Sequence, residues 1–188
     1  ACDITNLKEL PDMDSAKQLG FVFPVYAWGA PEVMGAFVKK LPRPQVFTFG
    51  VCTCGSDAGL AMKQLSKLYP LSSSYSLVMP NNYIIGSDTD DEGEILRKLT
   101  AARSELERIS GEIQRQEPVY RVHEGGLAGI KSRFVNYGFN RFARSAKPFF
   151  AGDSCNGCGL CAGNCPAHAI TLRENKPVWA AQCYQCMR

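Results

Sequence analysis

Residues 155–166 read Cys155-Asn-Gly-Cys158-Gly-Leu-Cys161-Ala-Gly-Asn-Cys165-Pro166, which places four cysteines within eleven residues. Thiolates at this spacing bind [4Fe–4S] clusters. The iron corners of a cluster lie close together, so a short loop brings the thiolates at positions i, i+3 and i+6 onto three of them. Pro166 turns the chain after the last thiolate and removes one backbone donor. The run therefore predicts an iron–sulfur centre that transfers single electrons.

A second run follows the first at a fixed offset. Cys183 and Cys186 come 28 residues after Cys155 and Cys158, and the sequence ends at Arg188. In two-cluster proteins the fourth cysteine of such a run binds the other cluster. We therefore expect two [4Fe–4S] clusters, each with a further ligand beyond Arg188. One would be bound by Cys155, Cys158 and Cys161, and the other by Cys165, Cys183 and Cys186.

Structural zinc and disulfides are the alternative uses of these cysteines. Zinc sites prefer two separated C-x2-C pairs, which a single continuous run ending in Cys-Pro does not supply. Nine cysteines cannot all pair within the chain, and disulfides need an oxidising compartment. No signal-peptide pattern is visible, and the apolar run 21–30 is too short to span a bilayer. We therefore expect a cytoplasmic location.

Length and composition allow two domains. A chain of 188 residues with 45% hydrophobic content can bury a core beside a small cluster-binding module. The net charge of +3 gives no indication of a nucleic-acid or membrane partner. Because a helical pattern ends at Glu117-Pro118, we expect an α/β domain over 1–117, a linker or docking helix over 118–150, and the cluster domain over 151–188.

The first 117 residues alternate between apolar runs and helical patterns. Strands are expected over 19–23, 45–52 and 75–79, and helices over 31–41, from a cap at Ser56 or Asp57 to about 68, and over 90–116. The last helix carries an apolar seam that is typical of packing on a sheet, with a coiled coil as the alternative. The seam consists of Ile95, Leu99, Ala102, Leu106, Ile109 and Ile113. This order predicts a parallel α/β sheet with ligands at the carboxyl ends of its strands.

Two unusual loops follow the first two expected strands. The first, residues 24–31, carries Tyr26 and Trp28 beside Gly29, and the second begins Thr53-Cys54-Gly55-Ser56. Aromatic side chains on a turn suit stacking on a flat heteroaromatic ring, and glycine lets backbone amides approach the polar edge of the ring. Aromatic residues in loops also serve in packing, so both interpretations stay open. For Cys52 and Cys54, packing or contact with such a ring is favoured over a redox disulfide.

On these loops, on residues 79–83 and 140–145 and on the cysteine runs, the chain resembles the fused flavodoxin–ferredoxin electron carriers of anaerobes. The resemblance covers essentially the whole chain. It implies a flavodoxin-like parallel sheet followed by a small α+β bacterial ferredoxin-type domain. It also implies that FMN lies against the residues of the two loops, namely Pro24, Tyr26, Trp28, Gly29, Thr53, Cys54, Gly55 and Ser56.

The sequence departs from that family at its start. Flavodoxin-like domains hold the FMN phosphate in a Ser/Thr/Gly-rich loop after the first strand, and this sequence has no such loop. Residues 1–4 look like the tail of the second strand, and in the order 2-1-3-4-5 the missing first strand is interior. We therefore expect a chain truncated at both ends. The complete protein would bind FMN, whereas this chain would bind it weakly or not at all.

Residues 118–150 are basic and aromatic. They hold six Lys or Arg against one Glu, interleaved with seven Tyr or Phe. Although such interleaving occurs in nucleic-acid binding, we interpret it as an amphipathic helix near 127–142 that docks the ferredoxin domain onto the sheet. Its positive charge would also attract an acidic redox partner.

The sequence thus predicts an electron-transfer protein of anaerobic metabolism that passes electrons between an FMN-type flavin and [4Fe–4S] clusters. Redox proteins are the expected partners, and neither nucleic acid nor a membrane is expected. The alternative is a ferredoxin whose flavin-free α/β domain only docks a redox partner, and a reductase acting on a small substrate also stays open. No Ser/His/Asp or Cys/His arrangement is evident, so we expect an electron carrier or oxidoreductase component rather than a stand-alone catalyst.

Overall fold

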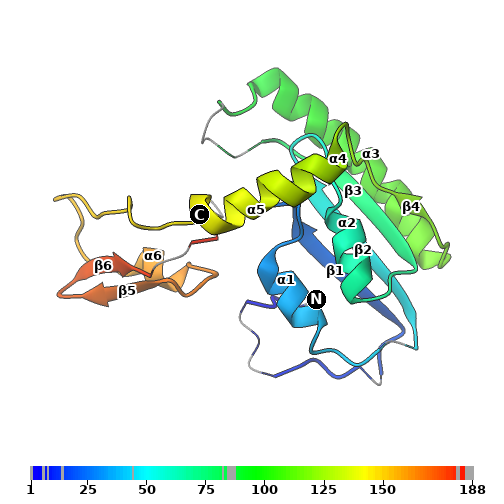
Figure 1. Cartoon of the computed structure of the whole chain (residues 1–188), viewed down its shortest axis with the longest axis horizontal. Coiled ribbons are helices and arrows are strands. Elements are labelled where there is room, and N and C mark those ends of the chain that lie inside the picture. Colours follow the sequence, from blue (N-terminus) through cyan, green and yellow to red (C-terminus); the bar gives the residue numbers. More distant parts are fainter. Residues whose placement is uncertain are drawn as a thin grey trace. The chain divides into compact units, whose positions relative to one another are not determined.

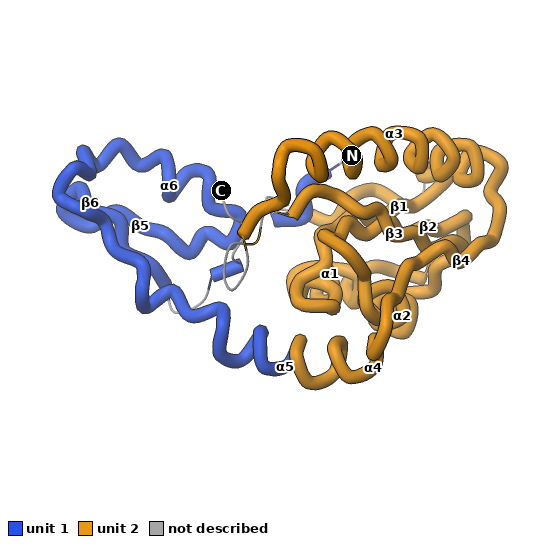
Figure 2. The backbone as a smooth tube through the Cα atoms, turned by 90° about the horizontal axis from the view of Figure 1, so that it is seen from above, with its two compact units in different colours: residues 1–7, 137–188 blue, residues 8–136 orange. Residues whose placement is uncertain are grey.

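The structure is a computed structural model that describes residues 2–5, 7, 9–13, 15–43, 45–81, 83, 88–180, 183 and 184. The chain forms two compact units (Figure 2). One unit comprises residues 8–136, and the other comprises residues 1–7 and 137–188. The boundary at residues 136 and 137 falls inside the segment 118–150.

The unit 8–136 is built on a four-stranded parallel sheet in the order β1-β2-β3-β4 (Figure 1). The strands are β1 (Gln18–Pro24), β2 (Phe47–Cys54), β3 (Ser73–Val78) and β4 (Tyr120–Arg121). The predicted parallel α/β sheet is confirmed, and it is consistent with a flavodoxin-like fold. The first three strands lie where apolar runs predict them. The two-residue β4 gives no comparable signal because so short a strand has no periodicity to detect.

Helices cover both faces of this sheet (Figures 1 and 2). The helices α1 (Glu32–Val38) and α2 (Ala61–Leu68) lie on one face, and α3 (Glu92–Gln114) lies on the other. On the α3 face, Val51 and Tyr75 form a core cluster with Ile109. On the opposite face, the ring of Phe21 contacts the ring of Tyr69 with centroids 5.3 Å apart. The core therefore sits between the sheet and its helices, as parallel sheets require.

The long helix α3 uses only part of its predicted apolar seam. Ala102 and Ile109 are buried, whereas Leu99 and Leu106 stay exposed. The N-cap Asp91 accepts a hydrogen bond from the backbone N–H of Glu94 at 2.8 Å, which satisfies one of the free donors at the helix start. The seam thus packs on the sheet as predicted, but its side that carries Leu99 and Leu106 stays exposed to solvent.

Two local predictions are wrong. The second helix begins at Ala61 rather than at a Ser56 or Asp57 cap, because Gly59 takes a left-handed conformation (φ +55°) that ends any earlier helical turn. Residues 2–5 form no strand. Instead the Asp3 carboxylate accepts hydrogen bonds from the backbone N–H and the hydroxyl of Thr5, which stabilises a local turn.

The segment 127–142 is largely helical, and its role in docking the ferredoxin domain stays a prediction. It runs through α4 (Ala128–Ile130), the π-helix η1 (Lys131–Val135), α5 (Asn136–Gly138) and the π-helix η2 (Phe139–Ala143). Single π-turns inside helices are rare and are frequent at functional sites. Across the described residues, no helix has the length and apolar character needed to span a membrane.

In the other unit, the segment after residue 150 is small and mixed in structure. It contains α6 (Leu160–Gly163) and a hairpin of β5 (Ile170–Arg173) and β6 (Lys176–Trp179). Glu174 and Asn175 join the two strands, both with positive φ (49° and 58°), as a tight two-residue hairpin turn requires.

Candidate metal centre

The cysteine run lies in a loop that two left-handed glycines shape. Gly157 and Gly159 have φ values of +73° and +78°, a conformation that side chains other than glycine adopt with strain. A Cβ at Gly157 would also lie 2.4 Å from the carbonyl oxygen of Asn175. The Asn156 carboxamide oxygen accepts a hydrogen bond from the backbone N–H of Cys158 at 3.1 Å. The backbone therefore turns tightly in the stretch where the cysteines alternate with Asn156, Gly157 and Gly159.

Cys165 already accepts a hydrogen bond at sulfur. The backbone N–H of Ala169 donates to Cys165 Sγ at 3.3 Å, and the N–H of His168 donates to the Cys165 carbonyl at 3.0 Å. Amide hydrogen bonds to sulfur are among the interactions that set the reduction potential of a cluster. The turn after Pro166 thus supplies a donor of the kind that a cluster-binding thiolate needs.

Arg144 holds the segment that carries Cys183. The backbone N–H of Cys183 donates to the Arg144 carbonyl at 2.8 Å, and the Arg144 Nε–H donates to the Cys183 carbonyl at 3.1 Å. The guanidinium also lies 5.5 Å from the centre of the Tyr184 ring. Arg144 is buried, and these contacts position Cys183 and Tyr184. Sequence reasoning missed this role, because the two residues lie 39 positions apart.

The predicted ligands differ in exposure. Cys158 and Cys161 are exposed, and Cys155, Cys165 and Cys183 are half-buried, whereas Cys186 lies outside the described residues. In the described part of the chain, no three His, Cys, Asp or Glu side chains gather closely enough to hold a metal ion. The thiol donors, the glycine-shaped loop and the amide at Cys165 Sγ fit an iron–sulfur cluster chemically. Assignment of ligands to individual clusters stays a prediction.

A family comparison agrees with this chemistry. The family model for a 4Fe-4S binding domain matches residues 151–171, which include the whole first cysteine run. No curated protein and no solved structure matches the chain. The match indicates that this part of the chain binds a [4Fe–4S] cluster and serves iron–sulfur electron transfer, which supports the ferredoxin part of the resemblance.

The two loops predicted to flank a flavin follow neighbouring strands. Pro24 at the end of β1 pairs with Thr53 of β2, and the N–H of Val25 donates to the Thr53 carbonyl at 2.8 Å. Tyr26 and Gly29 close a two-residue turn with two backbone hydrogen bonds of 3.0 Å. The structure thus brings both loops to the same edge of the sheet. Gly55 and Ser56 continue the second loop, and Ser56 is exposed.

The aromatic turn is strained and anchored from outside. Ala27 and Trp28 have φ values of 45° and 62°, which are uncommon for residues other than glycine. The Ser132 hydroxyl donates to the Trp28 carbonyl at 2.7 Å and accepts from the Leu60 N–H at 2.7 Å. The Asn136 amide donates to the Tyr26 carbonyl at 2.8 Å. The helix that begins at α4 therefore fixes both the turn and the start of α2.

Lys131 of the same helix links the two loops. Its ammonium lies 5.1 Å from the centre of the Trp28 ring and 3.0 Å from Asp57 Oδ2. The other carboxylate oxygen of Asp57 is buried without a hydrogen-bond partner. Sequence reasoning assigned residues 127–142 to docking but did not identify Lys131, Ser132 or Asn136. Their contacts join positions more than 70 residues apart, so local patterns carry no signal for them.

The thiols of Cys52 and Cys54 point into the core. Burial raises the pKa of Cys52 to about 12 and that of Cys54 to about 11. The Cys54 thiol contacts the Leu77 carbonyl at 3.9 Å. Both thiols are therefore protonated near neutral pH, and protonated thiols are poor nucleophiles for disulfide exchange. This environment agrees with packing rather than with a redox disulfide.

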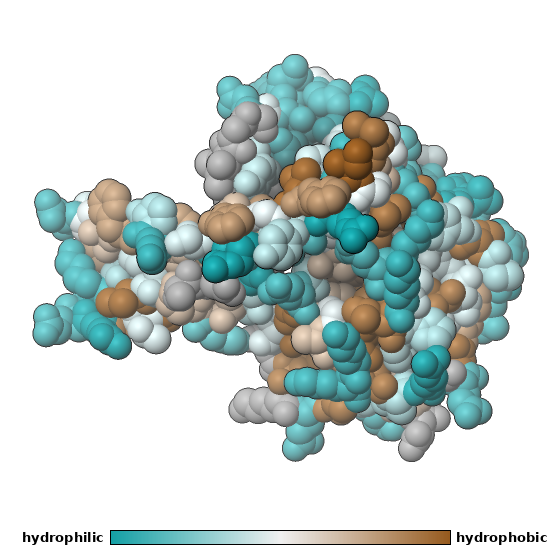
Figure 3. All heavy atoms as spheres, viewed as in Figure 1, coloured by the Kyte–Doolittle hydropathy of each residue, from teal (hydrophilic) through white to brown (hydrophobic). Residues whose placement is uncertain are grey.

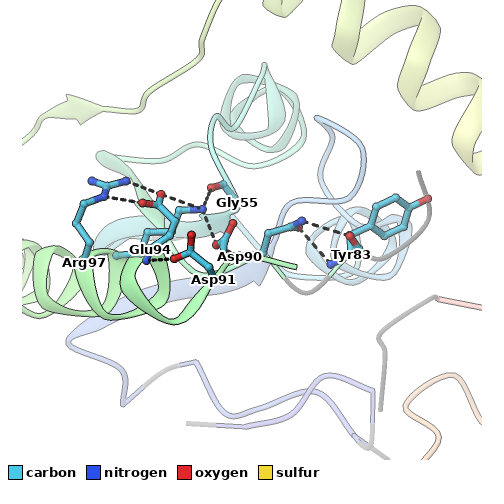
Figure 4. A network of polar contacts seen from close by, with 8 residues as sticks. Gly55, Tyr83, Asp90, Asp91, Glu94 and Arg97 are labelled. Atoms are coloured by element: carbon cyan, nitrogen blue, oxygen red, sulfur yellow. Dashed lines mark hydrogen bonds and ion pairs between the residues drawn. The ribbon is translucent and has the colours of Figure 1, made fainter. Parts of the chain in front are cut away.

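Lys98 joins the loops after β2 and β3 (Figure 4). Its ammonium donates to Asp90 Oδ2 at 2.7 Å and to the Gly55 carbonyl at 3.0 Å. Asp90 also accepts from the backbone N–H of Asn81 at 2.8 Å, and Asn81 in turn accepts from the N–H of Tyr83 at 3.2 Å. The hydrogen bond from Lys98 is the main reason why the pKa of Asp90 is lowered. Asn82, which belongs to the stretch 79–83 that carries the resemblance, lies outside the described residues.

Hydrophobic side chains gather on the outer surface of the helix at α4 (Figure 3). Leu127, Ile130 and Phe134 are exposed, at the three- and four-residue spacing of one helix face. The polar residues Ser132 and Asn136 lie toward the loops instead. The first part of this helix thus presents apolar side chains to solvent and polar ones to the loops.

Proposed function

We propose that this protein passes electrons between an FMN-type flavin and two [4Fe–4S] clusters. The observation that carries the proposal is the match of a 4Fe-4S binding domain to residues 151–171, over a loop with thiol donors and an amide bonded to Cys165 Sγ. A cluster transfers one electron at a time, and a flavin exchanges two, so the pair would connect two-electron and one-electron partners. Acidic redox proteins are the proposed partners, since the segment 118–150 is basic.

The flavin part of the proposal rests on the edge formed by the loops after β1 and β2. Ligands of parallel sheets bind outside the carboxyl ends of the strands. At this edge Trp28 and Tyr26 lie on a fixed turn, and Gly55 follows the neighbouring strand. The residues that would contact FMN are those named from the resemblance, except Cys54, whose thiol faces the core.

Replacing Cys158 tests the cluster assignment. In protein reconstituted anaerobically with iron and sulfide, Cys158→Ala should lose the brown absorbance and most of the bound iron of the first cluster, because one of its thiolates is missing. Cys2→Ala is the matched control, since Cys2 is also exposed but lies outside both runs. An unchanged iron and sulfide content in Cys158→Ala would exclude Cys158 as a ligand.

Titration with FMN, followed by flavin fluorescence, tests the flavin part. We expect weak quenching by this chain and weaker quenching by Trp28→Ala. Trp179→Ala, in β6 of the other unit, should leave the quenching unchanged. If neither this chain nor a gene product extended upstream quenched the fluorescence, the flavin-free docking domain would be the better account of residues 8–136.

A further inference from the structure

A cationic side chain lies beside each of the two cysteine runs. The Lys176 ammonium donates to the carbonyl oxygen of Cys155 at 3.2 Å and to that of Gly152 at 3.4 Å. The Arg144 Nε–H donates to the carbonyl oxygen of Cys183 at 3.1 Å. Both contacts lie within the unit that comprises residues 1–7 and 137–188. Each predicted cluster therefore has a positive charge bound to the backbone of one of its ligands.

The two cations differ in their exposure to solvent. Lys176 is exposed at the start of β6, where water and salt screen its charge. The exposed fraction of Arg144 is only 7%. A charge that is removed from water interacts more strongly with its neighbours, because the effective dielectric constant around it is lower. At equal distance, the charge of Arg144 is therefore felt more strongly than that of Lys176.

Arg144 is held at Cys183 by both its backbone and its side chain. It directly follows the π-helix η2, and its carbonyl accepts a hydrogen bond from the backbone N–H of Cys183 at 2.8 Å. Its guanidinium lies 5.5 Å from the centre of the Tyr184 ring and donates to Asn140 Oδ1 at 3.5 Å. Because two hydrogen bonds join the same two residues, the guanidinium keeps a fixed position relative to Cys183.

Backbone hydrogen bonds also connect Cys165 to the segment that leads to Cys183. The N–H of Ala169 donates to Cys165 Sγ at 3.3 Å, and the Ala169 carbonyl accepts from the N–H of Ala180 at 2.7 Å. Ala180 precedes Cys183 by three positions. The turn after Cys165 and the segment before Cys183 are therefore joined, which suits two ligands of one cluster.

We propose that Arg144 is a positioning residue of the second cluster and that its buried charge makes this cluster the more easily reduced of the two. The proposal rests on the two-cluster part of the proposed function. On reduction a cluster accepts one electron from the donor and gains one negative charge. The guanidinium stabilises this added charge, whereas the screened ammonium of Lys176 stabilises that of the first cluster less. At equilibrium an electron therefore resides mostly on the second cluster.

Coulomb's law gives the expected size of the effect. For a separation of about 10 Å, one unit charge changes the equilibrium constant of reduction on the order of tenfold at an effective dielectric constant of about 20, and about twofold at about 80. The first value applies to buried Arg144 and the second to exposed Lys176. For a one-electron couple, a tenfold change corresponds to about 59 mV.

Redox potentiometry monitored by EPR tests the proposal on the complete gene product, reconstituted anaerobically with iron and sulfide. Dithionite supplies the electrons, and analysis of bound iron and sulfide counts the Fe4S4 units before each measurement. We expect two one-electron steps whose equilibrium constants differ on the order of tenfold. Joint replacement of Cys155, Cys158 and Cys161 should remove the step at lower potential and keep the step at higher potential.

Two substitutions at one position separate the charge of Arg144 from its packing. Arg144→Met keeps a long side chain without the charge, so the equilibrium constant of the higher-potential step should fall on the order of tenfold. Arg144→Lys keeps the charge and should leave that step near its original potential. Lys176→Met is the matched control and should shift only the lower-potential step, by about twofold. If Arg144→Met binds a single Fe4S4 unit, the joint cysteine replacement decides alone.

Four results would overturn the proposal. One is a single potential shared by two bound Fe4S4 units. Another is an Arg144→Met protein with two units and unchanged potentials, or an Arg144→Lys protein that shifts as much as Arg144→Met. The third is loss of the higher-potential step, rather than the lower one, on joint replacement of Cys155, Cys158 and Cys161. The fourth is a single Fe4S4 unit in the unmodified gene product, which would also remove the second cluster from the proposed function.

Discussion

The sheet unit and the cysteine-bearing segment differ in the interactions that stabilise each of them. In the unit 8–136, the side chains of Met62, Leu65 and Tyr75 are completely buried. Among the described residues of 151–180, the buried residues are Ala169 and Pro177, while 66% of Leu160 is exposed. Segments too small to bury a core commonly depend on metal binding for their folded structure. The difference indicates that apolar burial stabilises the sheet and that cluster binding stabilises the cysteine loop.

Removal of iron and sulfide should produce the largest difference in stability between the two regions. After anaerobic chelation, amides of residues 155–180 should lose their protection from hydrogen exchange, whereas those of β1 to β3 keep it. For small metal domains the binding free energy is folding free energy, about 10 kcal/mol for structural zinc. Hydrogen exchange with mass spectrometry measures both regions in one sample. Equal protection of residues 155–180 with and without iron would contradict the comparison.

Truncating a core side chain should destabilise the sheet unit and leave the cysteine loop unchanged. Leu65→Ala removes a completely buried side chain of α2, and we expect a loss of about 2–5 kcal/mol in the free energy of unfolding of the sheet unit. Urea unfolding followed by circular dichroism measures it, and cluster absorbance at low urea should stay unchanged. Leu68→Ala is the matched control in the same helix, because Leu68 is exposed and should lose less than about 1 kcal/mol. Similar losses for the two variants would argue against a core at this position.

Ser132→Ala should have a smaller effect within the sheet unit. The substitution leaves the Leu60 N–H and the Trp28 carbonyl without their shared partner, at a cost of about 1–2 kcal/mol. Because the turn loses an anchor, the emission of Trp28 should shift to longer wavelength. Ser104→Ala, at an exposed position of α3, should change neither property. An unaltered emission in Ser132→Ala would show that this helix does not position the turn.

The smallest expected effect is on the acid side of the stability curve. Hydrogen bonding to Lys98 lowers the pKa of Asp90 in the folded state. The ordinary value in an unfolded chain is about 3.9, so this contribution is complete above about pH 4 and is lost as the pH falls through the folded-state pKa. Lys98→Met should therefore flatten the loss of stability between neutral and acidic pH, and Lys67→Met, at an exposed position of α2, should not. Identical acid profiles for the two variants would show that the ion pair between Lys98 and Asp90 does not contribute to the loss of stability at acidic pH.

Local sequence patterns predicted the regular elements of the sheet well. The boundaries of the apolar runs at 19–23 and 45–52 and of the helical pattern at 90–116 differ by one or two residues from those of β1, β2 and α3. These elements follow from hydrophobic periodicity, which is a local property. The start of α2 was mispredicted because Gly59 takes a left-handed conformation and the Ser132 hydroxyl binds the Leu60 N–H, and neither is visible in a cap pattern at Ser56 or Asp57.

The chemistry of the candidate sites could be predicted from the sequence, but the residues that hold these sites in position could not. Cysteine spacing alone indicated the iron–sulfur loop, since ligand type and spacing are written in the sequence. The residues that hold the sites are polar and distant in sequence. Arg144 binds the Cys183 backbone, and Lys98 binds Gly55 and Asp90. Such contacts arise only when the fold brings separate segments together, so no local pattern announces them.

Native mass spectrometry of anaerobically reconstituted protein, combined with Mössbauer spectroscopy, tests the central claim most directly. We expect the mass to increase by whole Fe4S4 units and the iron to show the spectrum of a [4Fe–4S] cluster, and we expect one Fe4S4 unit to be lost when Cys155, Cys158 and Cys161 are replaced together. Bound zinc in place of iron, or an Fe4S4 content that this triple replacement leaves unchanged, would contradict the account.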